Sequence, residues 1–497
     1  MKYKVKSWRV YQMNFFRVKE KYNNMSLPVK AALWYTLCNV INKGIALVST
    51  PIFTRILTEE QYGTFAIFQS WFSILIIFTS LNVFQGGYQK GLILYKKDEM
   101  NFTSSQLGLT TIITAIWFII YILKIDFWTN VFELPINLML AMFIELLFIP
   151  ALELWSSQQI FNYKYKKYVF LTIAMSVFSL GGGVIAVLYS SEKLEARVYT
   201  DVLSKALFAG ALFILIFKSG KCFFSRQYWK FALLFNLPLI PHYLSTFILN
   251  QSDRVMIGRM VGNSQAAYYS VAYTISTMMI LITGAINNSL TPYIYRALEK
   301  NNEKSIKDAT KPILILVAAL CFITMAFSPE AIRIFGGEKY LEAIYVIPPI
   351  AASVFFIFLY TLFSNIEFYF QKTRFIALAT GISAIVNLIL NFIFIKIYGY
   401  YAAGYTTLVC YICLAVLHYI FYRKVLKAEN IKNNVYDMKM ICLMSFIVII
   451  GMTVFAVTYR YIFIRYAILA SILIITLIFR NKIKSLLLEF RKMKKNS

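Results

Sequence analysis

The stretch that most limits the fold runs from about Ala31 to Leu57, because it is long enough to cross a bilayer and carries a lysine near its middle. Read as a helix at about 100° per residue, it places its polar side chains largely on one face. These side chains are Asn39, Asn42, Lys43, Thr50 and Thr54. A lysine at mid-bilayer costs about 2.5–3.5 kcal/mol unless it faces water or a partner. The stretch therefore predicts a membrane helix with one face turned to a polar environment.

Two readings of Lys43 follow from that cost. In the first, Lys43 pairs with a carboxylate on a neighbouring helix and only fixes helix packing. In the second, it supplies a fixed positive charge inside a water-filled cavity. The amides and hydroxyls that share its face favour the cavity.

The composition assigns the whole chain to the membrane class. Hydrophobic residues make up 59% of the sequence and charged residues only 15%, which is too apolar for a soluble protein. The net charge of +27 does not indicate a nucleic-acid partner. The basic residues lie in short runs between apolar stretches, which is the pattern of cytoplasmic loops facing an anionic leaflet.

Hydropathy predicts an all-α polytopic membrane protein with about fourteen transmembrane helices. The predicted spans are 31–54, 62–85, 107–124, 134–156, 168–190, 197–217, 231–253, 265–290, 310–328, 341–364, 375–396, 400–422, 437–459 and 461–479. Segments between spans alternate between rich and poor in Lys and Arg, and the rich ones include both ends of the chain. The positive-inside rule therefore predicts cytoplasmic termini and a cell (inner) membrane location. No cleavable signal is expected, because the basic first 30 residues contain no apolar core.

An internal repeat relates the two halves of the chain. At an offset of about 204 residues, Arg55–Gln61 falls on Arg259–Gln265, and at a similar offset Lys166 falls on Lys372. The repeat predicts two pseudo-symmetric six-helix lobes in the same orientation, followed by two extra helices. The predicted divisions are a basic segment 1–30, an N-lobe 31–230, a C-lobe 231–430, and helices 13 and 14 with a basic tail in 431–497.

The seventh span mirrors the first in carrying a polar stripe. Pro238, His242, Thr246, Asn250 and Asp253 lie on one face, and the prolines are expected to bend the helix. Facing stripes at equivalent places in two halves predict a central cavity. Its predicted lining is Asn39, Asn42, Lys43, Thr50, His242, Thr246, Asn250 and Asp253, with Arg55, Arg254 and Arg259 at the outer mouth.

Three further charged residues lie inside predicted spans. Asp201 and Lys205 are spaced to neutralise each other along one helix. Glu145 stands among apolar residues, so it is protonated, paired with a lysine such as Lys43, or part of a proton-coupling route. Glu145 and Asp201 are therefore candidate coupling carboxylates, and the coupling ion, a proton or sodium, stays open.

Cysteines and loops limit the chemistry. Cys410 and Cys413 form a C-x-x-C inside an apolar span without histidine or cysteine neighbours, so neither a metal site nor a cofactor is predicted. Loops between spans are too short for an extramembrane catalytic domain, so no catalytic residues are predicted. A membrane glycosyltransferase or polymerase is thereby disfavoured. A scaffold of an assembly complex would not need polar stripes inside the bundle.

Several motifs resemble those of the bacterial oligosaccharide flippases, in the polysaccharide branch of the superfamily that also holds multidrug exporters. The motifs are Leu33–Tyr35, Asn39–Gly44, Thr50–Arg55, Tyr62–Gly63, Ser252–Gly258 and Tyr269–Tyr273. The resemblance implies two six-helix lobes around a cavity that opens alternately to either side. It implies export of O-antigen or capsule repeat units linked to undecaprenyl pyrophosphate.

The resemblance agrees with the residues and names partners. A diphosphate needs a cation such as Lys43, and sugars need amides and aromatic surfaces. The implied partners are the lipid-linked glycan and the bilayer, with a polysaccharide polymerase and a chain-length regulator as further expectations. The main alternative is an organic-cation antiporter, but its cavity should carry carboxylates rather than a lysine.

Overall fold

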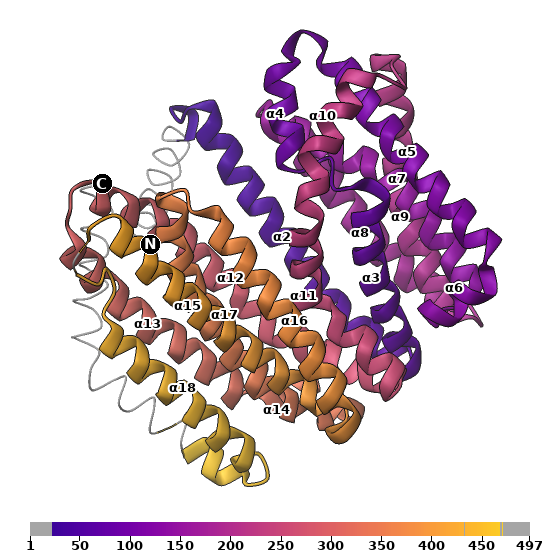
Figure 1. Cartoon of the computed structure of the whole chain (residues 1–497). Helices are drawn as coiled ribbons and strands as arrows, with labels where there is room; N and C mark the ends of the chain where they lie inside the picture. The colour runs from indigo at the N-terminus through magenta and orange to yellow at the C-terminus, as the bar shows by residue number, and fades with distance from the viewer. Residues whose placement is uncertain (1–21, 432, 468–469, 471–497) are drawn as a thin grey trace, which may run out of the picture. The chain divides into compact units, whose positions relative to one another are not determined.

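The computed structural model describes residues 22–431, 433–467 and 470, and every regular element in these residues is a helix (Figure 1). The long helices are α2 (Leu27–Ile56), α3 (Glu59–Ser80), α5 (Glu99–Leu123), α7 (Ile136–Phe161), α8 (Tyr165–Tyr189), α9 (Lys193–Gly220), α11 (Ile240–Met260), α12 (Asn263–Glu299), α13 (Glu303–Ala326), α15 (Ile347–Tyr369), α16 (Thr373–Tyr398), α17 (Tyr401–Ala428) and α18 (Met438–Thr458). The short elements are α4 (Gly86–Leu94), η1 (Lys96–Asp98), α6 (Ile125–Phe132), α10 (Arg226–Asn236), η2 (Leu237–Leu239), α14 (Ser328–Phe335) and η3 (Glu338–Val346).

The all-α membrane fold predicted from hydropathy is confirmed. In the described part of the chain, 13 helical segments are long and apolar enough to cross a bilayer. Each coincides with one of the first thirteen predicted spans. Most of the predicted fourteenth span, 461–479, and of the basic segment 1–30 lies outside the described residues.

The chain forms two compact units. Unit 1 comprises residues 1–49 and 75–238, and unit 2 comprises residues 50–74 and 239–497. The boundary between Pro238 and Leu239 falls in η2, where the seventh predicted span is interrupted between α10 and α11. A proline lacks the backbone N–H that would continue the helix, which accounts for this interruption.

The limits of the units differ from those of the predicted lobes, because residues 50–74 join unit 2. Local contacts explain this assignment. The Thr54 hydroxyl donates to the Phe335 carbonyl at 2.6 Å, and the Lys339 ammonium donates to the Leu57 carbonyl at 2.9 Å. The end of α2 and the start of α3 are therefore held by α14 and η3, which follow far later in the sequence.

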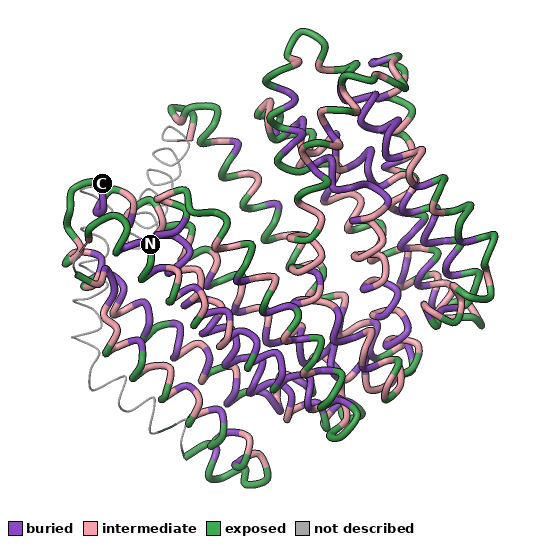
Figure 2. The backbone as a smooth tube through the Cα atoms, viewed as in Figure 1, coloured by how far each residue is buried: buried purple, intermediate pink, exposed green. Residues whose placement is uncertain are grey.

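Burial differs strongly between helices of the same apolar character (Figure 2). In unit 2, α15 is buried along most of its length and packs against α12, α13, α17 and α18. In unit 1, α7 is the most buried long helix and packs against α5, α8 and α9. A helix that is apolar all round needs neighbours on every side, which these central positions provide. By contrast, α2 and α8 leave much of their surface exposed.

Candidate functional site

The first predicted site helix, α2, contacts α8 and the end of α7 along one side. The Tyr35 hydroxyl donates to the Gln159 carbonyl at 3.0 Å, and the Ser176 hydroxyl donates to Asn42 Oδ1 at 3.0 Å. Between them, Cys38 Sγ lies 3.0 Å from Thr172 Oγ1. Asn42 therefore serves as a contact between helices of unit 1.

Lys43 and Asn39 are exposed, whereas Asn42 is half-buried. Among the described residues, no carboxylate pairs with Lys43, and Glu145, considered above as a partner, pairs with Lys205 instead. The hypothesis that Lys43 pairs with Glu145 is thus wrong. The other interpretation, a cation inside a water-filled cavity, stays a prediction.

Unit 1 contains a largely buried cluster of four charged side chains and one serine. We call it the unit 1 charge cluster, and its members are Glu145, Ser179, Arg197, Asp201 and Lys205. The Lys205 ammonium lies 2.7 Å from Glu145 Oε1 and 2.8 Å from Asp201 Oδ2. Arg197 lies 3.6 Å from Asp201, and the Ser179 hydroxyl donates to Asp201 Oδ1 at 2.7 Å. The predicted Asp201–Lys205 pair therefore forms.

The unit 1 charge cluster joins three helices, because Glu145 comes from α7, Ser179 from α8 and the other members from α9. Its two acids and two bases sum to no net charge, which suits a position inside a membrane. The side chain of Glu145 is fully buried. This arrangement supports packing directly. A coupling role for Glu145 and Asp201 stays a prediction.

The polar stripe of α11 lies in unit 2, as do Thr50 and the three predicted mouth arginines. His242 is half-buried and Thr246 is exposed. The Thr246 hydroxyl donates to the His242 carbonyl at 3.0 Å, and the Asn250 amide donates to the Thr246 carbonyl at 2.7 Å. Asn250 Oδ1 also accepts from Tyr411 at 3.3 Å. His242 Nδ1 is buried without a hydrogen-bond partner among the described residues, Thr246 is exposed, and Asn250 already contacts a neighbouring helix.

At the other end of the stripe, Asp253 is fully buried in what we call the Asp253 cluster: Asp253, Tyr269, Asn387, Asn391, Thr406 and Thr407. Asp253 accepts hydrogen bonds from the Tyr269 hydroxyl, from Asn391 and, at 3.1 Å, from Thr407. The cluster draws on α11, α12, α16 and α17. Four helices thus converge on one carboxylate, and a buried carboxylate is stable only when its oxygens are satisfied in this way.

Thr50 and the predicted mouth arginines mostly contact backbone or neighbouring side chains. Thr50 is buried. Arg55 donates to the Pro51 carbonyl at 2.6 Å and to the Ile334 carbonyl at 2.9 Å, so it closes the ends of two helices. Arg254 is buried, donates to Gln251 at 2.7 Å and stacks over the Tyr273 ring at 4.5 Å. Arg259 is exposed.

The sequence analysis missed a buried acid and base pair in unit 2. Glu367 on α15 lies 3.0 Å from Nδ1 of His418 on α17, and both side chains are almost fully buried. The Tyr360 ring stacks on the imidazole at 5.5 Å. Glu367 escaped notice because the predicted tenth span stops at residue 364, whereas α15 continues to Tyr369.

Within the described residues, no group of three or more His, Cys, Asp or Glu side chains is arranged to hold a metal ion. Polar groups instead fall into buried clusters that join helices and into exposed positions on α2 and α11. Together with the 13 helical segments of the described residues that are long and apolar enough to cross a bilayer, these features define a polytopic helical membrane protein.

Comparison with known sequences then identifies the family. The sequence model of the polysaccharide biosynthesis protein family matches residues 29–298, and the MatE model matches residues 238–393. The first match covers more than half of the chain. The chain therefore belongs to the polysaccharide biosynthesis protein family, and the resemblance to oligosaccharide flippases is confirmed.

Two relatives cover most of this chain. "Lsg locus putative protein 1" of Haemophilus influenzae is 24% identical over 372 residues, which are 72% of this chain and 88% of that protein. "Probable low-salt glycan biosynthesis flippase Agl15" of Haloferax volcanii is 23% identical over 397 residues, 77% of this chain and 80% of that protein. These relatives and the family match confirm the expectation of a transporter rather than an enzyme.

Solved structures show the same fold. A lipid II flippase, MurJ, in an inward closed conformation aligns with a TM-score of 0.68 at 17% identity, covering 91% of this chain and all of that one. An inward-facing multidrug resistance transporter of the MOP superfamily aligns with a TM-score of 0.61 at 13% identity, covering 79% of this chain and 96% of that one. At these identities the likeness concerns the fold alone.

Proposed function

We propose that this protein is a flippase that moves oligosaccharide repeat units linked to undecaprenyl pyrophosphate across the bacterial cytoplasmic membrane. The repeat units would feed an O-antigen, a capsule or a similar surface polysaccharide. The family match over residues 29–298 carries this proposal, and a relative named as a glycan-biosynthesis flippase supports it. Transport would proceed by alternating access to the two sides of the membrane, with proton or sodium coupling.

The placement of Lys43 fits this substrate. Its ammonium is exposed near the middle of a membrane helix, without a carboxylate partner among the described residues. A lysine in that position is costly unless it meets water or an anion. A pyrophosphate bears the opposite charge, so we propose that Lys43 binds it. Exposed Asn39, together with His242 and Thr246, would hydrogen-bond the sugars.

A deletion strain tests the proposed function. Without the protein, surface polysaccharide should disappear, and lipid-linked repeat units should accumulate where only the cytoplasmic side is accessible. Spheroplasts treated with an impermeant enzyme that cleaves the glycan distinguish the two sides. Accumulated repeat units that this enzyme still digests would mean that translocation does not need the protein. Pull-down of a polymerase and a chain-length regulator would test the proposed partners.

The proposed orientation is tested separately. Reporter fusions after Lys230 and after Lys427 should read cytoplasmic, and one near Asn263 should read periplasmic, if both termini are cytoplasmic. A reversed pattern at any of these positions contradicts the proposed topology.

A second candidate is an organic-cation antiporter, which the MatE match over residues 238–393 favours. Such a protein would protect cells against lipophilic cations. Carboxylates should then line its substrate path, yet Asp253 and Glu145 are fully buried and already hydrogen-bonded. Ethidium efflux that falls on deletion, with surface polysaccharide unchanged, would select this candidate.

A further inference from the structure

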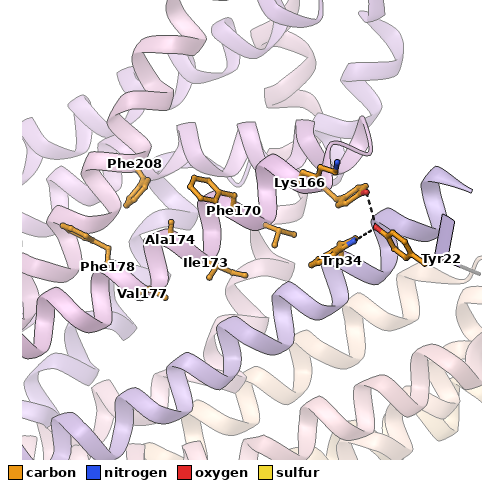
Figure 3. Close-up of a pocket in the computed structure, with 11 residues that line it drawn as sticks. Tyr22, Trp34, Lys166, Phe170, Ile173, Ala174, Val177, Phe178 and Phe208 are labelled. Carbon is orange, nitrogen blue, oxygen red and sulfur yellow. Dashed lines mark hydrogen bonds between the residues drawn. The ribbon is translucent and has the colours of Figure 1, made fainter. Parts of the chain in front are cut away.

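A groove runs along α8 in unit 1, between α8 and the start of α2. Figure 3 shows its lining residues, and its volume is about 770 Å³, within the usual size range of ligand sites. None of the Asp or Glu side chains in the described residues lines it. We call it the α2–α8 groove. None of the site residues predicted from the sequence lies in it.

One end of the α2–α8 groove is polar and basic. The Trp34 indole donates to the Tyr22 hydroxyl at 2.8 Å, and the Tyr22 hydroxyl lies 3.5 Å from that of Tyr165 (Figure 3). The Lys166 side chain lies beside them and is exposed, and the Lys30 ammonium sits over the Tyr22 ring at 5.4 Å. The Lys166 ammonium and the neighbouring hydroxyls suit an anion, and Lys30 adds positive charge nearby.

The pKa of the Tyr22 hydroxyl reflects the same positive charges. Its hydrogen bond with Tyr165 lowers the pKa of the Tyr22 hydroxyl, and Trp34 and the positive charges of Lys30 and Lys166 lower it further. Tyr22 precedes the first membrane helix. Negative charge is thus favoured at this end of the groove.

The rest of the groove is apolar. Its wall repeats at helical spacing along α8 through Phe170, Ile173, Ala174, Val177 and Phe178, and Phe208 of α9 is also part of the lining. From Lys166 to Phe178 the wall is about 18 Å long at 1.5 Å per residue. This length of apolar wall suits a hydrocarbon chain that runs along α8. Phe170 and Val177 remain largely exposed, so this wall is open to a lipid chain from the bilayer.

We infer that the α2–α8 groove binds the phosphate-proximal part of a single-chain isoprenyl phosphate lipid, with its phosphate at Lys166 and its chain along α8. Charge complementarity selects a phosphate head, and the proposed function selects an isoprenyl chain over a two-chain phospholipid. The inference rests on the proposed function, because the lipid that it assigns is the carrier of the transported glycan, held here before its pyrophosphate reaches Lys43.

Photo-labelling of the purified full-length protein in phosphatidylcholine nanodiscs tests this assignment. The probe is a photoreactive polyprenyl phosphate, compared with the matching polyprenol that lacks the phosphate. Label should map to peptides of α8 and α2, and unlabelled polyprenyl phosphate should compete far better than phosphatidylglycerol. Equal competition by phosphatidylglycerol would overturn the inference, because the groove would then hold bulk lipid.

Variants with matched controls test binding of the phosphate head and binding of the isoprenyl chain separately. Lys166→Gln should reduce labelling by the phosphate probe about tenfold and leave polyprenol labelling unchanged, whereas neighbouring Lys167→Gln should change neither. Ala174→Trp, which fills the groove, should reduce labelling by both probes about tenfold, whereas Ile185→Trp, exposed on the same helix outside the groove, should not. Wild-type labelling of both Lys166→Gln and Ala174→Trp would overturn the inference.

Binding is measured here without transport, so the two proposals fail separately. Lys166→Gln alters only an exposed side chain, which keeps the test valid even where Ala174→Trp disturbs folding. A wild-type protein that labels as expected but does not support polysaccharide export would overturn the proposed function alone. A protein that supports export while its labelling ignores Lys166 and Ala174 would overturn the groove alone.

Discussion

The ammonium nitrogen of Lys205 lies 2.7 Å from a carboxylate oxygen of Glu145, and this contact joins α9 to α7 inside unit 1. Both residues lie within membrane-spanning helices. Removing one partner of such a pair leaves a buried charge without compensation, which usually lowers stability by about 3–5 kcal/mol.

Lys205→Met should therefore lower the free energy of unfolding of unit 1 strongly and reduce protein abundance. Replacing both partners, as Glu145→Gln with Lys205→Met, should recover most of the loss, because Asp201 still has Arg197 beside it. Melting temperatures of the purified variants measure the effect. A double variant no more stable than Lys205→Met would argue against pairing as the reason.

Lys43 is exposed, so its substitution should affect transport and leave folding unchanged. Lys43→Gln keeps length and hydrogen-bonding capacity without charge and should abolish polysaccharide export at normal abundance. Lys43→Arg should keep much of the activity if charge suffices, since the two cations differ mainly in shape and hydration. Export at the wild-type rate by Lys43→Gln would show that Lys43 does not bind the anion.

Asp253→Asn should destabilise unit 2, because it places an NH₂ group among donors that now point at a carboxylate. The loss should be about 1–3 kcal/mol, the usual effect of an unsatisfied buried polar group. Asp308→Asn is the matched control, since the Asp308 side chain is 57% exposed and should change little. Equal melting temperatures for the two variants would contradict the structural role of the Asp253 cluster.

Replacing Gly63 or Gly44 by alanine should change stability in opposite directions. A Cβ at Gly63 would lie 1.7 Å from the Asn263 carbonyl oxygen, so Gly63→Ala must push α3 away from α12. A Cβ at Gly44 meets no atom within 4 Å. Gly44→Ala should stabilise the helix by about 0.5–1 kcal/mol, whereas Gly63→Ala should lower the melting temperature by several degrees. The reverse order would refute this packing.

Glu330 on α14 predicts a pH dependence. Burial alone would raise the pKa of Glu330, but hydrogen bonds from Tyr466, its own backbone and Arg465 hold it below the ordinary value. A lowered folded pKa gives stability that is present above the unfolded pKa, about 4.3, and is lost as the pH falls through the folded value. Glu330→Gln should thus melt below wild type at pH 7.

The gap between Glu330→Gln and wild type should narrow below about pH 4, where the wild-type carboxylate becomes protonated. The control is Glu338→Gln, because Glu338 pairs with Arg333 but its side chain is 73% exposed. Such a surface pair contributes at most about 1 kcal/mol. A gap that stays constant from pH 7 to pH 4 would exclude the charge of Glu330 as its cause.

The sequence alone determined which segments form the long helices, although several helix ends differ from the predicted limits, as at α5, which begins at Glu99 rather than at residue 107. A membrane span is recognised by a local property, about twenty apolar residues in a row. Thirteen predicted spans therefore coincide with helices in the described residues. The break at Pro238 and the Asp201–Lys205 pair also depend only on neighbours along the chain. Family membership followed from the same local motifs.

Only the tertiary structure decided which polar groups meet. Helical periodicity shows that Glu145 needs a partner, but the choice of Lys205 over Lys43 depends on which helices are adjacent and at what depth. The same holds for Asp253, which looked like part of an exposed stripe and lies at the meeting point of four helices. Thr50 and the residues after it joined unit 2 because α14 and η3, far along the chain, offer the hydrogen bonds that hold them.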